Sequence, residues 1–312
     1  MKHRVVFLVG PTAVGKSAVG VCLAGKIGGE IISCDSMQVY KGMEIISCQP
    51  DEGLKKKIPH HLIAEVLPSR EFNVSSYRRR AVKLIDQIIK RGRVPVFVGG
   101  TGLYMSIVID GIFIVKAEDL ALREKFYQQA LEHGSAFLHE RLKKVDPEAA
   151  GKIHPNDTRR MVRALEVFEV TGKPISFLQK QRKGIVDKYD LSIFCLNMER
   201  QLLYKRIKQR VDEMFALGLE DEVKNLLKRK LSMTASKAIG IAELKGYFDG
   251  EYGLEEAKEK ICRNTCLYSK RQLTWFRKDK RVRWIDVGLE DKPRDVAGRI
   301  IKYFSPFKKG GL

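Results

Sequence analysis

Six apolar runs, rich in β-branched residues, recur along the chain between longer periodic segments. They cover residues 5–10, 30–36, 60–66, 93–100, 191–197 and 282–287. Runs of this length and composition are typical of buried strands. Because helical patterns separate many of them, we predict the α/β class, with a doubly wound, mostly parallel sheet.

The helical period is clearest in VSSYRRRAVKLIDQIIKRG, residues 74–92. Its apolar side chains recur at the spacing of one helix face. They are Ala81, Leu84, Ile85, Ile88 and Ile89. Ser75 or Ser76 stands near the expected start, and Gly92 follows the expected end.

Between the fourth and fifth apolar runs the pattern changes to helix after helix. The segments DLALREKFYQQALEHG, SAFLHERLKKVD and DTRRMVRALEVFEVTG contain no convincing strand. We therefore predict an all-helical domain, residues 116–189, inserted into a core formed by residues 1–115 and 190–312. Within that core, residues 199–280 are predicted to be helical and are very basic.

Composition and charge narrow the function. The 312 residues are 44% hydrophobic and 31% charged, as in ordinary globular proteins, and no apolar run approaches the roughly 18–20 residues of a membrane span. The first run is also too short for a signal peptide, so we expect a cytoplasmic protein. The net charge of +20 favours a polyanionic partner, nucleic acid above all, over added solubility or attraction to a membrane.

The segment GPTAVGKS, Gly10–Ser17, follows the first predicted strand and matches G-x-x-x-x-G-K-[ST] at every fixed position. Its glycines permit a loop whose backbone N–H groups face an anion, and the next helix adds its positive end. Lys16 adds a cation, and the Ser17 hydroxyl can hold Mg²⁺, the one cofactor that we predict. This makes the core P-loop-type. The predicted phosphate-binding residues are Gly10, Thr12, Ala13, Val14, Gly15, Lys16 and Ser17.

The usual acidic partner of such a loop is missing. A nucleotide-splitting protein normally has a second strand that ends in an acid and helps to hold Mg²⁺. Here RVPVFVGG ends in glycine and Thr101, and the only acid at a strand end is Asp35. Because ligands bind beyond the carboxyl ends of parallel strands, Asp35 and Thr101 converge with the phosphate loop if the strands are adjacent. Each alone could instead cap the next helix.

Motifs along nearly the whole chain resemble those of the tRNA dimethylallyltransferases, also called tRNA isopentenyltransferases. They are GPTAVGKS, DSMQVYKGM, PHHLI, FNVSSYRRRA, VPVFVGGTGLYM, IHPNDTRRMVRALEV, TGKPIS, MFALGLEDEV and KRQLTWFRKD. DSMQVYKGM and GGTGLYM are highly specific when they accompany this phosphate loop. The chain departs from the family at residues 42–50, where it reads GMEIISCQP instead of the usual GMDIGTAKP.

The resemblance implies that the loop holds dimethylallyl diphosphate and that no phosphoryl group is transferred. The dimethylallyl group passes to the exocyclic amine of the tRNA adenosine immediately 3′ to the anticodon, and diphosphate leaves. We choose Asp35 as the base that accepts the amine proton. Lys16, Mg²⁺ on Ser17 and the loop N–H groups meet the charge of the leaving diphosphate, and by resemblance Thr101 supports it.

The resemblance also implies contacts with the anticodon stem-loop of tRNA. Gln38 offers an amide suited to two-point recognition of adenine, and Arg123 adds a cation or a tRNA contact. The predicted tRNA-binding residues are Asp35, Ser36, Met37, Gln38, Thr101, Arg123, Arg159, Arg160, Met161, Val162, Arg163, Lys270, Arg271, Gln272 and Trp275.

The arginine-rich stretch NDTRRMVRALEV has a second interpretation. It places three arginines in one helical turn, with Asn156 or Asp157 as the expected cap. From spacing alone, Arg163 could simply pair with Glu166 or Glu169. The resemblance favours a tRNA contact for this stretch.

The late segment NTCLYSKRQLTWFRKDK interleaves cations with aromatic residues. Such interleaving is typical of phosphate contact combined with base stacking. The other interpretation is an amphipathic helix that buries Leu267, Leu273 and Trp275, and we expect both to hold on different faces.

Three classes of function remain open. The first is an RNA prenyltransferase; a close variant would act on free adenine nucleotides, although the basic segments favour RNA. The second is a small-molecule P-loop kinase, which would consume ATP and leaves the basic helical half unexplained. The third is a non-catalytic RNA-binding protein, which is disfavoured because Lys16, Ser17, Asp35 and Thr101 are all present. We expect a monomer that does not bind membranes.

Overall fold

The computed structural model describes residues 2–113 and 119–304. The chain divides into two compact units, one made of residues 1–108 and 186–312 and the other of residues 109–185. The helical insertion predicted over residues 116–189 falls on nearly the same stretch of chain as the second unit. Its predicted first residue lies outside the described residues.

The first unit is built on a single sheet in which all paired strands are parallel. In spatial order the strands are β3 (His60–His61), β2 (Gly29–Ser33), β4 (Val94–Gly99), β1 (Arg4–Val9), β5 (Asp190–Asn197) and β6 (Val282–Asp286). The predicted α/β class and parallel sheet are confirmed.

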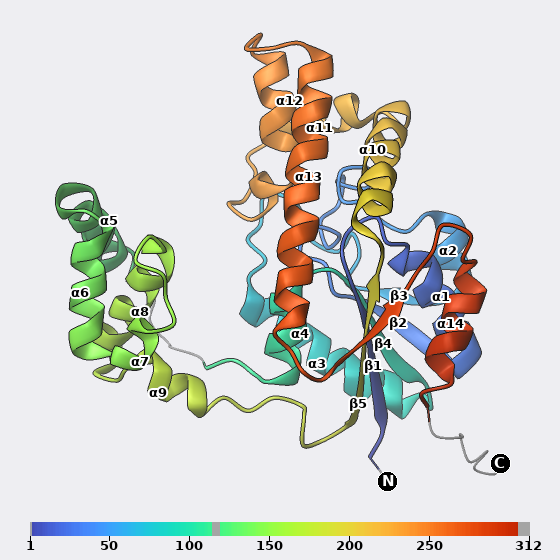
Figure 1. The fold of residues 1–312 in the computed structure, drawn as a ribbon, viewed down its shortest axis with the longest axis horizontal. Coiled ribbons are helices and arrows are strands. Elements are labelled where there is room, and N and C mark those ends of the chain that lie inside the picture. The colour runs from blue at the N-terminus through green and yellow to red at the C-terminus, as the bar shows by residue number, and fades with distance from the viewer. Residues whose placement is uncertain (1, 114–118, 305–312) are drawn as a thin grey trace. The chain divides into compact units, whose positions relative to one another are not determined.

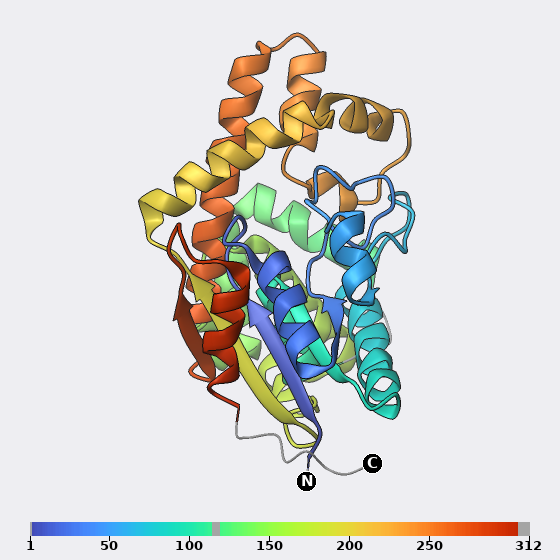
Figure 2. The same cartoon turned by 90° about the vertical axis from the view of Figure 1, so that its right-hand side faces the viewer.

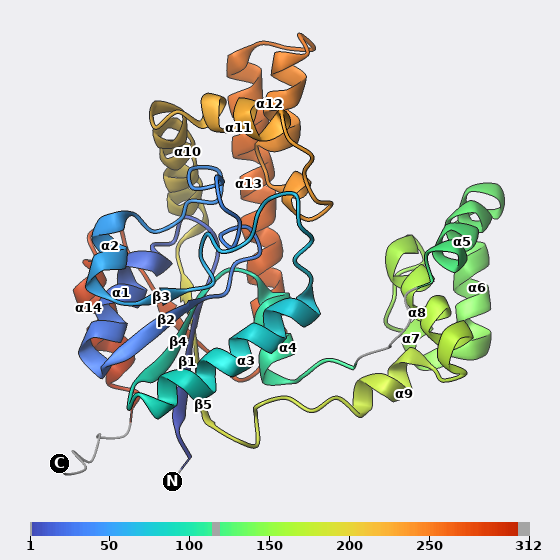
Figure 3. The ribbon, with the colours of Figure 1, turned by 180° about the vertical axis from the view of Figure 1, so that it is seen from behind.

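Helices cover both faces of this sheet, as a doubly wound fold requires (Figure 1). α1 (Lys16–Ile27) and α14 (Pro293–Ile301) pack together on one face, whereas α3 (Val74–Lys90) and α4 (Gly102–Ile109) lie on the other, as the view from behind also shows (Figure 3). Because both faces are covered, strands read as continuous apolar runs rather than alternating ones. In β1, for example, residues 5–9 are all 0% exposed.

A group of helices extends beyond the carboxyl ends of the strands (Figure 2). It contains α10 (Arg200–Ala216), α11 (Leu219–Leu227), α12 (Ile241–Phe248) and the 24-residue α13 (Leu254–Arg277). The short segments α2 (Glu52–Lys57) and η1 (Ala235–Lys237) also belong to this unit. The prediction of a helical stretch over residues 199–280 is confirmed. Across the described parts of the chain, no helix has the length and apolar character to cross a membrane.

One local prediction in this unit was wrong, and the start of α3 is set by a residue that was not predicted. The strand predicted over residues 60–66 is only two residues long, because Leu62 (φ 61°) and Ala64 (φ 50°) adopt left-handed backbone conformations that end the extended segment. The cap of α3 is Asn73, whose side chain accepts a hydrogen bond from the Ser76 N–H, so Ser75 and Ser76 lie in the first turn, near the helix start as predicted.

The second unit contains only helices among its described residues. They are α5 (Leu120–His133), α6 (Ser135–Val145), α7 (Pro147–Ala150), α8 (Thr158–Thr171) and α9 (Ile175–Lys180). Asp157 caps α8, one of the two predicted candidates. The unit has an apolar core of its own, to which Phe126 and Leu138 contribute fully buried side chains.

Candidate functional site

The phosphate loop connects β1 to the first turn of α1. Gly10 (φ 149°) and Gly15 (φ 96°) adopt backbone angles that favour glycine, and a Cβ on Gly10 would lie 2.7 Å from the Leu196 carbonyl oxygen. Lys16 Nζ donates to the Pro11 carbonyl at 2.6 Å. Burial lowers the pKa of Lys16 to about 8, although the nearby Asp35 carboxylate acts in the opposite direction. The lysine is therefore a cation that is poorly solvated until an anion joins it.

Gln272 of α13 ties this loop to the end of β4. Its Oε1 accepts a hydrogen bond from the Thr12 N–H at 2.9 Å, and its Nε2 donates to the Gly100 carbonyl at 3.0 Å. The side chain is 5% exposed, which counts against its predicted contact with tRNA. Ala13 and Val14 are also buried, so only their backbone N–H groups can face a ligand.

The carboxyl ends of β2 and β4 bring Asp35 and Thr101 together, as predicted. Thr101 Oγ1 accepts from the Ser36 N–H at 3.1 Å, and the Thr101 N–H donates to the Cys34 carbonyl at 3.0 Å. Asp35 Oδ1 accepts from the Met37 N–H at 2.9 Å. Burial raises the pKa of Asp35, although that hydrogen bond and the charge of Lys16 oppose the shift.

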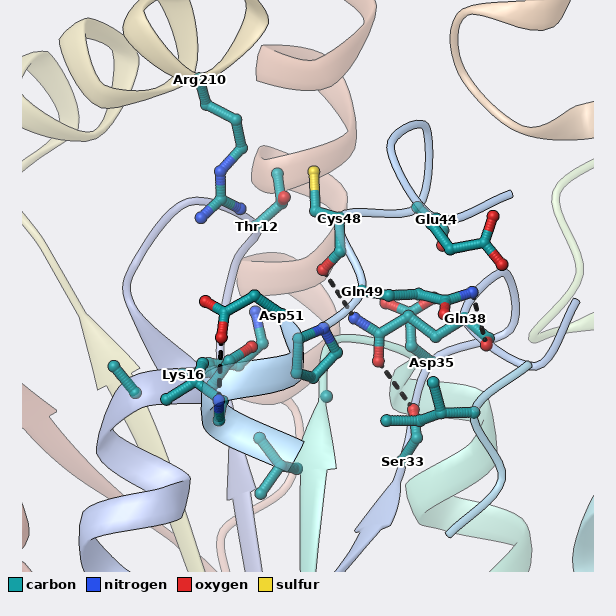
Figure 4. Close-up of a pocket in the computed structure, with 18 of the residues that line it drawn as sticks. Thr12, Lys16, Ser33, Asp35, Gln38, Glu44, Cys48, Gln49, Asp51 and Arg210 are labelled. Atoms are coloured by element: carbon teal, nitrogen blue, oxygen red, sulfur yellow. Dashed lines mark hydrogen bonds between the residues drawn. The ribbon is translucent and has the colours of Figure 1, made fainter. Parts of the chain in front are cut away.

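A cavity of about 690 Å³ is lined by Lys16 and Asp35 (Figure 4). It is lined by residues from the phosphate loop, the β2 end, α10 and α13. They include Thr12, Ala13, Gly15, Lys16, Ser17, Ser33, Asp35, Gln38, Glu44, Ile45, Ser47, Cys48, Gln49, Asp51, His60, Arg206, Arg210, Met214, Tyr268 and Gln272. The residues at 44–49, where the chain departs from the dimethylallyltransferase pattern, are therefore a wall of this cavity.

Two of the cations in this cavity were missed by sequence reasoning. Arg206 and Arg210 stand one helical turn apart on α10, and both line the cavity with Lys16. Burial lowers the pKa of Arg206, and the neighbouring charge of Arg210 adds to the effect. The signal was the i, i+4 spacing of the two arginines in KRIKQR, but nothing in the sequence says which face of α10 meets the phosphate loop.

The amide of Gln38 is held in one orientation. Its Oε1 accepts from the Ser33 hydroxyl at 2.9 Å, and its Nε2 donates to the Cys48 carbonyl at 3.1 Å (Figure 4). An amide oxygen has two lone pairs and an amide nitrogen two hydrogens. One acceptor and one donor position therefore remain for a ligand.

Ser17 lies in the first turn of α1 and lines the same cavity. Within residues 2–113 and 119–304, no three His, Cys, Asp or Glu side chains are close enough to hold a metal ion. A hydroxyl does suit Mg²⁺, which in phosphate sites is usually held by one or two protein oxygens together with substrate phosphates and water. Ser17 fits that pattern.

The exposed face of α13 carries the other predicted tRNA-binding residues of this unit. Lys270 and Arg271 are exposed, and the Arg271 guanidinium lies 5.7 Å from the centre of the Tyr268 ring. Trp275 is 37% exposed and packs against Gly102, where an added Cβ would lie 2.2 Å from its ring. The prediction that Trp275 and Leu267 are core residues was wrong, since Leu267 is also exposed.

In the second unit, Arg159 and Arg160 are exposed on α8. Arg163 pairs with Glu166 at 2.7 Å, as its spacing predicted, and Arg123 pairs with the same carboxylate at 2.9 Å. Burial raises the pKa of Glu166, but hydrogen bonds from the two arginines outweigh this effect and lower it. The two guanidiniums are therefore held together by one buried carboxylate.

Met161 and Val162 belong to the core of this unit. They are 0% and 1% exposed, because on α8 they point toward α5 and α6 rather than to the surface that carries Arg159. This burial counts against the predicted tRNA contacts of their side chains.

One cavity brings together the phosphate loop, the cations Lys16, Arg206 and Arg210, the Asp35 carboxylate and the oriented Gln38 amide. This lining is that of a P-loop-type protein with an anionic substrate and a second, polar one. The chain belongs to the IPP transferase family, whose model matches residues 38–279. It is 48% identical to the tRNA dimethylallyltransferase of Carboxydothermus hydrogenoformans, covering 93% of this chain and 94% of that protein, and 46% identical to that of Geobacillus thermodenitrificans, covering 98% and 97%.

Solved structures agree with this assignment. The full-length tRNA isopentenylpyrophosphate transferase of Bacillus halodurans is 41% identical, with a TM-score of 0.70 and 96% of each chain covered. A eukaryotic dimethylallyltransferase, captured acting on tRNA, is 29% identical with a TM-score of 0.82, covering 96% of this chain and 78% of that one.

Proposed function

We propose that this protein transfers the dimethylallyl group of dimethylallyl diphosphate to the exocyclic amine of the tRNA adenosine immediately 3′ to the anticodon, with release of diphosphate. The observation that carries the proposal is that one cavity is lined both by a phosphate loop with its cations and by the Asp35 carboxylate and Gln38 amide. Similarity to proteins named tRNA dimethylallyltransferases supports the reaction class.

The loop and its cations stabilise the leaving group. As the bond between the dimethylallyl carbon and the diphosphate oxygen breaks, negative charge grows on that oxygen. Lys16, Arg206 and Arg210 all line the cavity, and cations in a poorly solvated site stabilise such charge more strongly than they would in water. By resemblance, the Thr101 hydroxyl, which accepts the Ser36 N–H, supports the leaving group.

Asp35 serves as the base. The adenine amine is a weak nucleophile because its lone pair is delocalised into the ring, and it becomes acidic as its nitrogen bonds to carbon. One Asp35 oxygen is held by the Met37 N–H, which leaves the other to accept the amine proton. The raised pKa of Asp35 makes it a stronger base than an ordinary carboxylate.

Mg²⁺ would lie against Ser17 and the diphosphate. When bound, it neutralises charge on the diphosphate and so helps this group to leave. Removing Mg²⁺ with EDTA should therefore stop turnover, and adding it back should restore it. In solution we expect a monomer in the cytoplasm, where its RNA substrate is found.

The RNA substrate accounts for the charge of +20. Lys270, Arg271 and Arg159 are exposed, and such residues contact phosphates with a strong dependence on salt. An adenosine in a loop is also cheaper to unstack than one in a duplex, which suits a base that must enter a cavity.

The test offers the protein an unmodified anticodon stem-loop and Mg²⁺ with either dimethylallyl diphosphate or ATP. Digested nucleosides are then examined by mass spectrometry. We expect one isopentenyl unit on one adenosine, diphosphate release and no loss of ATP; a hairpin with guanosine in place of that adenosine is the matched control. ATP consumption without an RNA product would instead favour a kinase, and equal modification of free AMP would favour a nucleotide prenyltransferase.

A further inference from the structure

The wall of the cavity formed by residues 43–49 is a compact turn. The Ser47 N–H donates to the Met43 carbonyl at 3.2 Å, the Cys48 N–H to Ile45 at 2.9 Å and the Gln49 N–H to Glu44 at 2.9 Å. These bonds close the turn on itself. We refer to residues 43–49 as the wall turn.

The wall turn contains two locally unfavourable features. Cys48 has a left-handed backbone conformation (φ 48°), which non-glycine residues seldom adopt. Gln49 donates from Nε2 to the Gln38 and Tyr40 carbonyls at 3.1 and 3.0 Å, but its buried Oε1 has no hydrogen-bond partner among the described residues. A turn with these two costs needs support from outside its own residues.

That support comes from Glu222 in the first turn of α11. Its two carboxylate oxygens accept from the Ile45 and Ile46 N–H groups, each at 2.8 Å. Bonds from backbone N–H groups to a carboxylate are stronger than bonds between neutral groups. Glu222 is half-buried, whereas the preceding residue, Asp221, is exposed.

The wall turn in turn holds the amide of Gln38. The Cys48 carbonyl accepts from Gln38 Nε2 at 3.1 Å, while the Ser33 hydroxyl donates to Gln38 Oε1 at 2.9 Å. Together these two hydrogen bonds fix the orientation of the Gln38 amide, with Nε2 as the donor toward Cys48. Without the Cys48 carbonyl, the Ser33 hydroxyl alone would remain on the Gln38 amide among the described side-chain contacts. Because a hydroxyl can accept as well as donate, it does not by itself fix which end of the amide is the donor.

We propose that Glu222 is a positioning residue for base recognition: by holding the wall turn, it fixes which edge of the Gln38 amide meets the acceptor base. Adenine offers an amine donor beside a ring-nitrogen acceptor, and an oriented amide matches this pair at two points. This inference rests on the proposed function, because it concerns recognition of that adenosine. It assigns Glu222 to the RNA substrate and not to dimethylallyl diphosphate.

The experiment compares wild type, E222A, E222Q and D221A on anticodon stem-loops. Their target base is adenosine, 7-deazaadenosine or 1-deazaadenosine, each analogue lacking one ring-nitrogen acceptor. In wild type, one analogue should lower kcat/KM for RNA by about tenfold, the size expected for one lost base contact. In E222A that penalty should shrink to within about threefold and the RNA KM should rise about tenfold, while the KM for dimethylallyl diphosphate stays near wild type.

The other variants separate positioning from general damage. E222Q keeps one acceptor for the two N–H groups and should fall between wild type and E222A, whereas D221A should match wild type. Equal deaza penalties in wild type and E222A would overturn the proposal, as would an equal rise in the KM of both substrates. If wild type itself does not prenylate the adenosine hairpin, the proposed function fails instead, and circular dichroism shows whether each variant is folded.

Discussion

The Gln272 side chain of α13, which is hydrogen-bonded to the phosphate loop, gives the sharpest test of the site. Gln272 resembles a tRNA contact in the sequence, yet its amide joins the Thr12 N–H to the Gly100 carbonyl and is 5% exposed. The two interpretations predict that different substrates suffer when it is removed. Gln272→Ala should weaken binding of dimethylallyl diphosphate and leave the affinity for RNA nearly unchanged.

The size of the effect follows from the two hydrogen bonds. A buried polar group that loses its partner costs about 1–3 kcal/mol. Gly100 is buried and keeps the full cost, whereas Thr12 is partly exposed and recovers some of it. We expect about 2–4 kcal/mol of lost folding free energy. If roughly 1.4 kcal/mol of this loosens the phosphate loop, the KM for dimethylallyl diphosphate rises about tenfold.

The assay measures the KM for each substrate at a saturating level of the other, together with the thermal midpoint. Gln272→Glu should be at least as damaging, because a carboxylate oxygen would replace the donor that faces the Gly100 carbonyl. Arg271→Ala, the exposed neighbour, is the control and should raise only the KM for RNA. If Gln272→Ala raises the RNA KM and leaves that for dimethylallyl diphosphate unchanged, the tie has no role in donor binding and the reasoning is refuted.

Three further predictions follow. Because burial lowers the pKa of Lys16 to about 8, the lysine is charged below that pH and neutral above it. The affinity for a non-reactive diphosphate analogue, measured by calorimetry, should therefore fall above pH 8 by about tenfold per pH unit. Lys16→Arg should remove this pH dependence, and its persistence in that variant would contradict the assignment of the pH dependence to Lys16. Asp35→Asn still accepts the Met37 N–H, so it should lower kcat by at least about 100-fold at nearly unchanged analogue affinity, and a parallel loss of both would rule out the base role. Met161→Ala should destabilise the protein by about 2–5 kcal/mol in thermal unfolding. Arg159→Ala should instead keep the thermal midpoint and reduce the salt dependence of RNA binding. If Met161→Ala left the thermal midpoint unchanged and weakened RNA binding, Met161 would be placed at the RNA.

The sheet could be predicted from the sequence because its strands are buried on both faces. Such strands are continuous apolar runs, and five of the six predicted ones have nearly the observed limits. The exception, residues 60–66, has the same composition as a strand. Its extended path ends because Leu62 and Ala64 take left-handed angles. The loop that follows is held by bonds from the Ala64, Glu65 and Val66 N–H groups to the carbonyls of residues 38 and 39, which no local pattern reveals.

The site residues that follow strands of the sheet could be predicted from the sequence. Those that lie on one face of a helix could not. Asp35 comes two residues after β2, and Lys16 ends the phosphate loop that follows β1, so sheet geometry brings them together. Arg206, Arg210 and Glu222 act through side chains of helices beyond the sheet, and only packing decides which face meets the cavity. The same cause explains why the sequence predicts a tRNA contact for Met161, which shares a motif with exposed arginines but is buried in the core.

The phosphate loop alone does not determine the reaction. The reaction is determined by Asp35 and Gln38, which line the same cavity. A protein that splits a nucleotide needs an acid that helps to hold Mg²⁺ and water beside the terminal phosphate. Here the acid at the β2 end is held by the Met37 N–H, and its burial raises its pKa, which weakens it as a metal ligand and strengthens it as a base. The same cavity holds the Gln38 amide, whose donor and acceptor ends are fixed. This arrangement has no role in positioning a water molecule, but it matches the hydrogen-bond donor and acceptor on one edge of adenine. A phosphate loop that lines a cavity with these two side chains favours a reaction in which the diphosphate leaves intact and a carbon group is transferred.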